Sequence, residues 1–385
     1  MSWEIVKLDS CVNILSGFAF KSNCFNSNQE GMPLIRIRNV VESKIETYYS
    51  GEYDDQYLIK KGDLLVGMDG DFNRQKWNNE PALLNQRVCK ITPISEKINA
   101  SYLYHLLPKE LDRIHAITPC VTVKHLSVQK IKDIELILPS LPEQQRIADI
   151  LDKAEAITQK RAQVLTLCDE FLRATFLDMF GDPVSNPKGW EVDRLKNLTS
   201  KIGSGSTPRG GKESYLDSGM TLVRSLNVYD DEFVRRGLAF ISEAQADKLS
   251  NVALKADDIL LNITGASVCR CSMMDNSLLP ARVNQHVCII RPNGIDNLFL
   301  LHLLISKSYK RKLMTLATSG GATREALTKE DITELGIIVP PIEFQQRFSN
   351  IVEKVNGIKA RIQEAQELPI FDALSQQAFK GELTQ

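Results

Sequence analysis

The feature that most constrains this chain is an internal repeat that spans almost its whole length. Six short segments recur in the same order in both halves, and the offset between copies grows from about 187 to about 201 residues. A fixed order with a drifting offset is typical of a duplicated unit whose loops have changed length. The paired segments are WEIVKL (Trp3) and WEVDRL (Trp190), GMPLIRIRNV (Gly31) and GMTLVRSLNV (Gly219), KKGDLLVGMDG (Lys60) and LKADDILLNITG (Leu254), NQRVCKITP (Asn85) and NQHVCIIRP (Asn284), YLYHLL (Tyr102) and FLLHLL (Phe299), and LPEQQRIADIL (Leu141) and IEFQQRFSNIV (Ile342).

Each half begins with a region of mixed secondary structure, residues 1–140 and 181–340. Short apolar runs such as PLIRIRNVV, DLLVGM, RVCKITP and IELILP are bounded by Gly, Pro, Asn or Asp, as strands are. Helical patterns occur around YLYHLLPKELDRIHAI and LFLLHLLISKSYKRKLMTLA. Each region is long enough to form its own core, so we predict an α+β protein with two mixed α/β domains.

Each half ends in a helical segment, residues 141–180 and 341–385. Apolar residues in both segments recur at steps of three and four, the pattern of a coiled-coil seam. We therefore expect the two helices to pair as an antiparallel coiled coil with pseudo-twofold symmetry, and Pro369 to interrupt the second. The seam positions are Ile147, Ile150, Leu151, Ala154, Ile157, Val164, Leu165, Cys168, Phe171 and Leu172, then Phe348, Ile351, Val355, Ile358, Ile362 and Ala365.

Composition and charge exclude several classes of protein. The net charge is −1, so any nucleic-acid site must be a local basic patch. The eight Cys form no CxxC pair and the five His show no HxxxH spacing, so we expect no metal site. The first residues lack the pattern of a signal peptide, and no apolar run approaches 18 residues. We expect a cytoplasmic protein without a membrane span.

Catalytic motifs are also missing. VPPIE lacks the leading Asn or Asp and the aromatic residue of an amino-methyltransferase motif. SGSTPRGGKES departs from a phosphate loop at Ser206 and Glu213. Asp257 and Asp258 have no Glu-x-Lys partner nearby and are expected to precede or cap a strand. We predict a protein that is not an enzyme and uses no cofactor.

The ordered set of motifs resembles the specificity subunit of type I restriction-modification systems over the full chain. The resemblance depends on the two Trp-Glu starts, the SGFAFKS and GSGSTPRGG loops, the paired Asn-Gln segments and the Gln-Gln-Arg helix openings. It implies that each mixed domain is a target recognition domain for one half of a bipartite DNA site. It also implies that the helices set the gap between half-sites and dock two methyltransferase subunits, which restriction subunits join.

Two alternatives stay open. One is a specificity subunit of another restriction-modification class, because the partner determines that difference. The other is a coiled-coil scaffold whose β-rich ends bind proteins.

DNA contacts require Lys or Arg for phosphates and Arg, Asn or Gln for base edges, preferably on loops beside a rigid sheet. For each such residue the alternative is an ordinary solvated side chain, and the repeated Asn-Gln pair fits a structural role equally well. The candidates are Lys21, Arg36, Arg38, Asn39, Asn73, Arg74, Lys76 and Arg87 in the first domain, and Ser206, Thr207, Arg209, Lys212, Arg224, Asn227, Arg270, Arg282, Thr323 and Arg324 in the second.

The repeated Gln-Gln-Arg triplets at the two helix openings are expected to join helix to domain or to contact a partner subunit. They consist of Gln144, Gln145 and Arg146, and of Gln345, Gln346 and Arg347. His105 and His302, on the two shorter amphipathic helices, are expected to be packing residues.

Overall fold

The computed structural model describes residues 3–42, 44–119, 123–207, 211–319, 325–367 and 370–380. The chain forms two compact units, one of residues 1–161 with 366–385 and the other of residues 162–365. The last segment of the chain therefore belongs to the first unit, which the repeat alone did not predict. No helix within the described residues is long and apolar enough to cross a membrane.

The first unit is built around an antiparallel sheet whose strand order is β2-β10-β7-β8. A second sheet, β3-β5-β4-β9-β6, pairs β4 and β9 in parallel, and β1 pairs with β11. The bounds are β1 Glu4–Lys7, β2 Val12–Ser16, β3 Phe25–Asn26, β4 Met32–Ile35, β5 Tyr48–Tyr49, β6 Leu58–Ile59, β7 Leu64–Gly67, β8 Arg74–Lys76, β9 Ala82–Leu84, β10 Val88–Pro93 and β11 Glu135–Leu138.

The second unit repeats this plan. Its four-stranded sheet has the order β13-β21-β18-β19, its β14 pairs in parallel with β20, and β12 pairs with β22. The predicted duplication is thus present in the strand topology. The bounds are β12 Val192–Arg194, β13 Thr199–Ser204, β14 Met220–Val223, β15 Val228–Tyr229, β16 Glu232–Phe233, β17 Ala239–Ile241, β18 Ile259–Asn262, β19 Cys271–Met273, β20 Ala281–Val283, β21 Val287–Pro292 and β22 Gly336–Ile338.

The shorter helices follow the predicted patterns with two differences. The run PLIRIRNVV is a strand only to Ile35 and then turns into a short helix. The second amphipathic pattern divides into two helices because Ser306 is extended. The bounds are α1 Asn39–Glu42, α2 Ala100–Ile117, α3 Val128–Lys132, α5 Glu243–Lys248, α6 Asn297–Ile305, α7 Lys307–Ser319 and α8 Lys329–Thr333.

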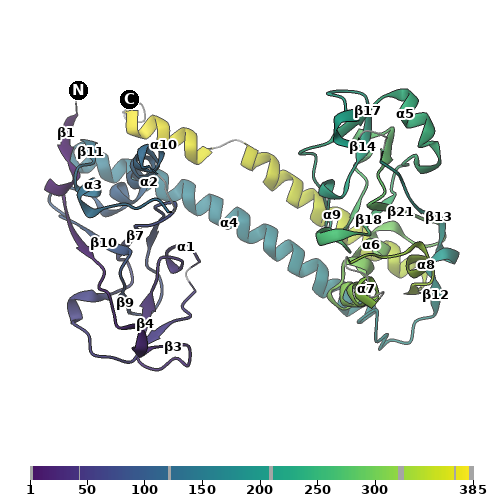
Figure 1. Ribbon diagram of the computed structural model, residues 1–385, viewed down its shortest axis with the longest axis horizontal. Coiled ribbons are helices and arrows are strands. Elements are labelled where there is room, and N and C mark those ends of the chain that lie inside the picture. Colours follow the sequence, from purple (N-terminus) through teal and green to yellow (C-terminus); the bar gives the residue numbers. More distant parts are fainter. Residues whose placement is uncertain are drawn as a thin grey trace. The chain divides into compact units, whose positions relative to one another are not determined.

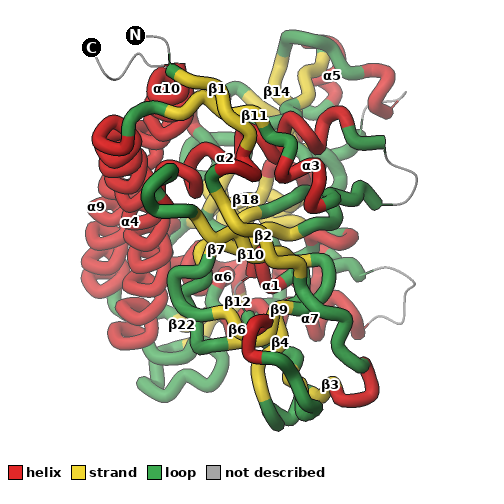
Figure 2. Tube along the Cα trace, turned by 90° about the vertical axis from the view of Figure 1, so that its left-hand side faces the viewer, coloured by secondary structure: helices red, strands yellow, loops and turns green. Residues whose placement is uncertain are grey.

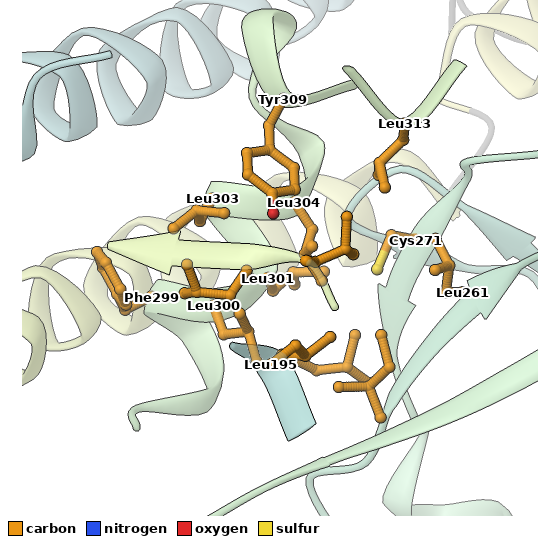
Figure 3. Packing of buried hydrophobic residues seen from close by; sticks show 14 of the residues in the cluster. Leu195, Leu261, Cys271, Phe299, Leu300, Leu301, Leu303, Leu304, Tyr309 and Leu313 are labelled. Atoms are coloured by element: carbon orange, nitrogen blue, oxygen red, sulfur yellow. The ribbon is translucent and has the colours of Figure 1, made fainter. Parts of the chain in front are cut away.

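Equivalent caps start the main helix of each domain. The Asn99 side chain accepts a hydrogen bond from the Tyr102 backbone at α2, and Asp296 accepts one from Phe299 at α6. In the second unit, α6 and α7 pack their apolar side chains on the four-stranded sheet, and Phe299 lies within this core (Figure 3).

Two long helical segments follow the mixed regions. Helix α4 (Leu141–Phe180) is an unbroken helix of 40 residues, and Gly181 follows it with a φ of +76°. Helix α9 (Ile342–Glu367) ends shortly before α10 (Ile370–Lys380) begins. The predicted interruption at Pro369 lies outside the described residues, so it stays a prediction.

Within the second unit, α9 packs antiparallel against the C-terminal part of α4 (Figure 2). The Phe348 ring lies 5.4 Å from that of Phe176 and 5.6 Å from that of Phe180. Further along α9, the Lys359 ammonium lies 2.9 Å from an Asp169 oxygen. Residue numbers rise along α9 as they fall along α4, which is what antiparallel packing requires.

The predicted seam is only partly correct. Ile157, Val164, Phe171 and Ile358 are 39–53% exposed, although all four were placed in the seam. Other predicted seam positions are buried, namely Ile147, Leu151, Ala154 and Leu172 on α4 and Phe348 and Val355 on α9, and burial extends to Phe176 and Phe180, which lie outside the predicted seam. The sheet and α6 compete with α9 for apolar contacts, so the buried face rotates away from a two-helix seam. Coiled-coil packing along the whole of both helices stays a prediction.

The C-terminal helix α10 completes the core of the first unit, where it lies beside α2 (Figure 1). The Phe379 ring lies 5.7 Å from that of Tyr102, and Phe371 lies 5.7 Å from the His105 ring. Ala378 and Phe379 are buried. His105 is itself fully buried and bonds to Asp152 of α4, in agreement with its predicted packing role.

Replacing Phe379 with Ala should therefore lower the stability of the first unit by about 3–5 kcal/mol, through lost burial and a residual cavity. Urea unfolding measures the change, and hydrogen exchange of α2 peptides localises it. The control is Gln376→Ala, an exposed position on the same helix, which should stay within about 0.5 kcal/mol of the wild type. Equal stability of both variants would contradict the assigned docking of α10.

Candidate functional site

In the first unit, four loops far apart in sequence meet at one end of the four-stranded sheet. The Gln86 amide donates to the Phe18 carbonyl at 2.8 Å, and the Met68 amide donates to the Arg87 carbonyl at 2.8 Å. The Leu126 amide donates to the Met68 carbonyl at 2.7 Å. We call this surface the first loop edge; it comprises residues 17–21, 68–73, 85–87 and 124–126.

The second unit has a similar arrangement, in which two of these three bonds recur at equivalent positions and the first loop is bonded differently. The Gly205 amide donates to the Asn284 carbonyl at 3.1 Å, and the Ile263 amide donates to the His286 carbonyl at 3.0 Å. The Leu327 amide donates to the Ile263 carbonyl at 2.8 Å. We call this surface the second loop edge; it comprises residues 204–207, 263–270, 284–286 and 325–327.

One glycine in each edge is required by close backbone approach. A Cβ on Gly17 would lie 2.0 Å from the Asn85 carbonyl oxygen, and one on Gly205 would lie 1.7 Å from that of Val283. Both distances are far inside van der Waals contact. The repeated Ser-Gly therefore holds the first loop of each edge against the Asn-Gln turn.

The two edges have a similar backbone arrangement, but their side chains differ in charge. In the first, Asp69 places one carboxylate oxygen 2.6 Å from His125 Nδ1 and the other 3.5 Å from Arg87 Nε. In the second, the Thr264 hydroxyl lies 2.6 Å from His286 Nδ1, and Gln285 Nε2 lies 3.0 Å from His286 Nε2. The first edge thus presents an ion-pair network and the second a set of polar side chains.

Several predicted DNA-contact residues lie on these edges. Lys21, Asn73 and Arg87 are exposed on the first edge, and Ser206 is exposed on the second. Thr207 contacts the Gln285 side chain there. Arg270 lies at the end of the 263–270 segment of the second edge. Arg36 and Arg224 directly follow β4 and β14, the strands whose last residues bond to the two Asn-Gln turns.

Three of the predicted arginines stack on tyrosine rings. The guanidinium carbon of Arg74 lies 3.6 Å from the centroid of Tyr104, on α2. Arg270 lies 4.3 Å from Tyr229, and Arg224 lies 5.2 Å from the Tyr215 ring. Stacking fixes these guanidinium groups through cation–π attraction. Arg74 in particular is half-buried against α2 rather than presented at the loop edge.

Asn39 and Asn227 do not fit the predicted role of DNA contact. Both are buried, and each side chain accepts a backbone hydrogen bond from three residues earlier, from Arg36 at 2.8 Å and from Arg224 at 3.0 Å. They hold the turn after β4 and β14. Their recurrence in the repeat reflects this shared turn.

Arg282 is also structural, since its guanidinium donates to the carbonyls of Ala246 and Ala281 at 3.1 and 3.0 Å. Arg38 pairs with Glu46 at 3.3 Å. Lys76 is exposed at the end of β8 away from the loop edge. Arg209, Thr323 and Arg324 lie outside the described residues, as does the side chain of Lys212.

The Asn-Gln pair divides its roles between its two residues. Asn85 and Asn284 are buried, and the Asn284 side chain accepts a bond from the His286 amide at 3.1 Å. Gln86 and Gln285 are exposed. The Asn284 side chain therefore supports its turn, whereas the Asn85 side-chain oxygen is buried without a hydrogen-bond partner, and both glutamines lie at the surface.

The first glutamine of each helix opening is an internal clamp, so a partner contact by Gln144 or Gln345 does not fit. Each is 1% exposed. The side-chain oxygen of Gln144 accepts a hydrogen bond from the Asn99 backbone amide at 2.8 Å. The side-chain oxygen of Gln345 accepts one from the Asp296 backbone amide at 2.9 Å. Their side-chain amides donate to the Pro139 and Pro340 carbonyls at 2.9 and 2.7 Å.

The other members of the triplets face outward. Gln145 is exposed but accepts a bond from the Asn99 side chain at 2.8 Å. Arg146, Gln346 and Arg347 are exposed. For these residues, contact with a partner subunit stays a prediction.

Sequence reasoning missed two exposed residues of the first edge. His125 reaches Asp69 from 56 positions away, and no local pattern indicates that pairing. Phe18 is 49% exposed and its ring lies 5.1 Å from that of Tyr57. The aromatic residue within the loop segment SGFAFKS was the signal from which Phe18 could have been proposed as a site residue.

One group in the described part of the chain has the composition of a metal site, namely His105, Asp152 and Glu155. His105 Nε2 lies 2.7 Å from Asp152, and the Tyr104 hydroxyl donates to Glu155 at 3.1 Å. These two bonds tie α2 to α4, whereas His105 Nδ1 is buried without a hydrogen-bond partner. We therefore assign the trio a structural role.

Both halves of the chain match one known class of domain. A family profile described as the type I restriction modification DNA specificity domain matches residues 1–167 and again residues 187–368. The specificity subunit of the type I restriction enzyme EcoBI from Escherichia coli is 31% identical over 425 aligned positions, covering 100% of this chain and 86% of that subunit. The chain belongs to this DNA specificity family, as the motifs predicted.

More distant relatives agree with this assignment. The MjaVIII specificity subunit of Methanocaldococcus jannaschii is 20% identical, with 92% of this chain and 86% of that subunit covered. The crystal structure of the type I restriction-modification S subunit of M. genitalium matches with a TM-score of 0.63 and 15% identity, covering 99% of this chain and 96% of the other. The predicted fold, with mixed domains and internal duplication, is confirmed.

The clamp assignment predicts a stability effect for Gln144→Leu. The variant leaves the Asn99 backbone amide and the Pro139 carbonyl without their buried partner. The free energy of unfolding should therefore fall by about 1–3 kcal/mol. Urea titration provides the measurement. Arg146→Ala, two positions along on the exposed face, is the control and should change stability by less than about 0.5 kcal/mol. A Gln144→Leu protein as stable as the control would refute the clamp.

Proposed function

We propose that this chain is the DNA sequence-recognition subunit of a type I restriction-modification complex, in which each loop edge reads one half of a bipartite site. The family match to both halves supports the recognition role. The observation that carries the two-site proposal is the pair of loop edges, which have equivalent backbone bonds and different side chains. Equivalent frames with different side chains suit two half-sites of different sequence.

Because the overall charge is close to zero, attraction to DNA would depend on the local charges of the loop edges. With a net charge of −1, the chain has no general attraction to a polyanion. Exposed cations such as Lys21 and Arg87 would supply local phosphate or base contacts. Arg146 and Arg347 are exposed near the helix openings, where they would meet a partner subunit or the DNA backbone.

The long helices are proposed to set the spacer between the half-sites. The chain passes between its two units twice, within α4 near Arg161 and at the end of α9 near Ala365. A helix advances about 1.5 Å per residue, so seven added residues lengthen it by roughly 10 Å.

Seven-residue helical insertions after Arg161 and after Ala365, made together, should therefore lengthen the unspecified spacer by about three base pairs, at 3.4 Å per step. Mapping of the methylated motif in cells that express the variant with its partner subunits provides the measurement. The control places the same seven residues in the exposed loop at Ser185, which should leave the spacer unchanged. An unaltered spacer in the helix variant would remove the spacing role.

The chain is further proposed to supply no chemistry itself and to depend on two methyltransferase subunits and on restriction subunits. One solved structure with a TM-score of 0.53 comes from work on complex assembly of a type I system, and that subunit is 17% identical to this chain. A docking surface is available on α4. Val164, Leu167 and Phe171 are 39%, 52% and 53% exposed.

These three apolar side chains form one stripe. At about 100° per residue they fall within an arc of roughly 60°, on a different face from the buried Leu172 and Phe176. An exposed apolar stripe on a helix is typical of a protein interface. We assign this stripe to a methyltransferase subunit, since the family role of the chain requires such a partner.

Leu167→Asp and Phe171→Asp should each weaken the complex with the methyltransferase subunit by about tenfold or more, because both place a charge in an apolar contact. Titration of the purified subunits provides the affinity. Gln163→Asp adds the same charge at an exposed polar position of α4 and should leave the affinity near that of the wild type. Unchanged binding by both apolar-site variants would exclude the stripe as the docking surface.

A further inference from the structure

We infer that Arg87 is the specificity-determining residue of the first loop edge and that it reads a guanine, with Asp69 and His125 as positioning residues. The inference rests on the proposed function and deepens it. It follows from the backbone at Arg87, from the ion pairs around its side chain, and from the residue at the same place in the second loop edge.

The backbone holds Arg87 in an unusual conformation. Its φ is +72°, a region that side chains other than those of Asn, Asp and His seldom adopt. The Met68 amide bonds to the Arg87 carbonyl and fixes the turn. Glycine or asparagine would fit this backbone with less strain. An arginine in such a strained position is a reason to assign its side chain a function.

The surrounding ion pairs orient the guanidinium. The Arg87 side chain is 53% exposed, whereas Asp69 is 27% exposed and lies 3.5 Å from Nε. The other Asp69 oxygen accepts a hydrogen bond from His125 Nδ1 at 2.6 Å. Asp69 is therefore held from one side by His125 and contacts the Nε side of the guanidinium. The two Nη groups remain for a ligand.

One Nη group is close to a ring nitrogen that cannot accept its proton. Arg87 Nη1 lies 3.2 Å from His125 Nδ1. Because Nδ1 donates to Asp69, it has no lone pair for Arg87. Guanine presents two neighbouring acceptors, O6 and N7, in the major groove, and the forked Nη pair of arginine matches them. The geometry thus favours guanine over the other bases.

The second edge has a different residue at the same place. His286 accepts the equivalent backbone bond, from Ile263, and its ring meets Thr264 instead of a carboxylate. Asp69 and Thr264 occupy equivalent bridges, to His125 and to Ala326. The same position thus changes from a buttressed arginine to a histidine beside Gln285. A difference at a shared position is what two unlike half-sites require.

The decisive variant is Arg87→Lys, which keeps the positive charge but loses the fork. It should be expressed with its methyltransferase partner in cells without other DNA methylation, and the methylated sites mapped. We expect one G·C position in a single half-site to become degenerate, with discrimination reduced about 5- to 150-fold. Asp69→Asn should relax the same position less. His286→Ala should alter only the other half-site.

Arg113→Ala is the matched control. Arg113 is also an exposed arginine paired with a carboxylate, Glu110 at 3.0 Å, but it lies on α2 outside the loop edge. It should leave the motif unchanged. Three outcomes overturn the inference: an unaltered motif with Arg87→Lys, an unaltered motif with Arg87→Gln, or a uniform loss of methylation in Arg87→Gln that Arg87→Lys restores. The last would indicate a phosphate contact.

Failure of the proposed function looks different. If the wild-type chain with its partner subunits produced no methylated motif that depends on this gene, both the recognition role and the inference would be removed. If the wild-type motif is present and the Arg87 variants leave it intact, the recognition role stands and Arg87 is not its reader.

Discussion

The structure depends on the burial of both ends of one unbroken helix in two different cores. Near its start, α4 contributes Ile147 and Leu151 to the core of the first unit; near its end it contributes Phe176 and Phe180 to that of the second. Polar side chains of α4 find partners on neighbouring elements; for example, Asp169 forms an ion pair with Lys359 of α9. Burial alone would lower the pKa of Lys359, yet the hydrogen bond to Asp169 and nearby acidic charge raise it, so the Lys359 side chain stays protonated.

The loop edges show how one frame can serve two recognition tasks. Backbone bonds at equivalent positions, such as those from Met68 to Arg87 and from Ile263 to His286, hold loops of both edges, and required glycines at positions 17 and 205 keep the first loop close to the sheet. The side chains at the rim are then free to differ, as with the Asp69–Arg87 pair in one edge and Thr264 with His286 in the other. A rigid frame with variable rim residues suits base reading, since position and chemistry are set separately.

Much of this organisation was predictable from the sequence, because a duplication doubles every signal. The two domains and the long helices both followed from repeated segments and helical spacing. Side-chain roles were harder to predict. Gln144 and Asn39 recur because they clamp turns, and only the folded chain shows that they are buried. Arg74 has the chemistry of a base reader but lies against Tyr104, and His125 joins the edge from a distant segment.

The most direct test of the recognition role is a map of methylated bases across the genome of the source cell, with this gene present and deleted. The account predicts that deletion abolishes one split, asymmetric methylated motif and leaves all others in place. That motif would supply both half-sites and the spacer. A motif without an unspecified spacer, lost on deletion, would contradict the assignment of one half-site to each loop edge. An unchanged methylome, in cells shown to express this chain with its partner subunits, would contradict the recognition role itself.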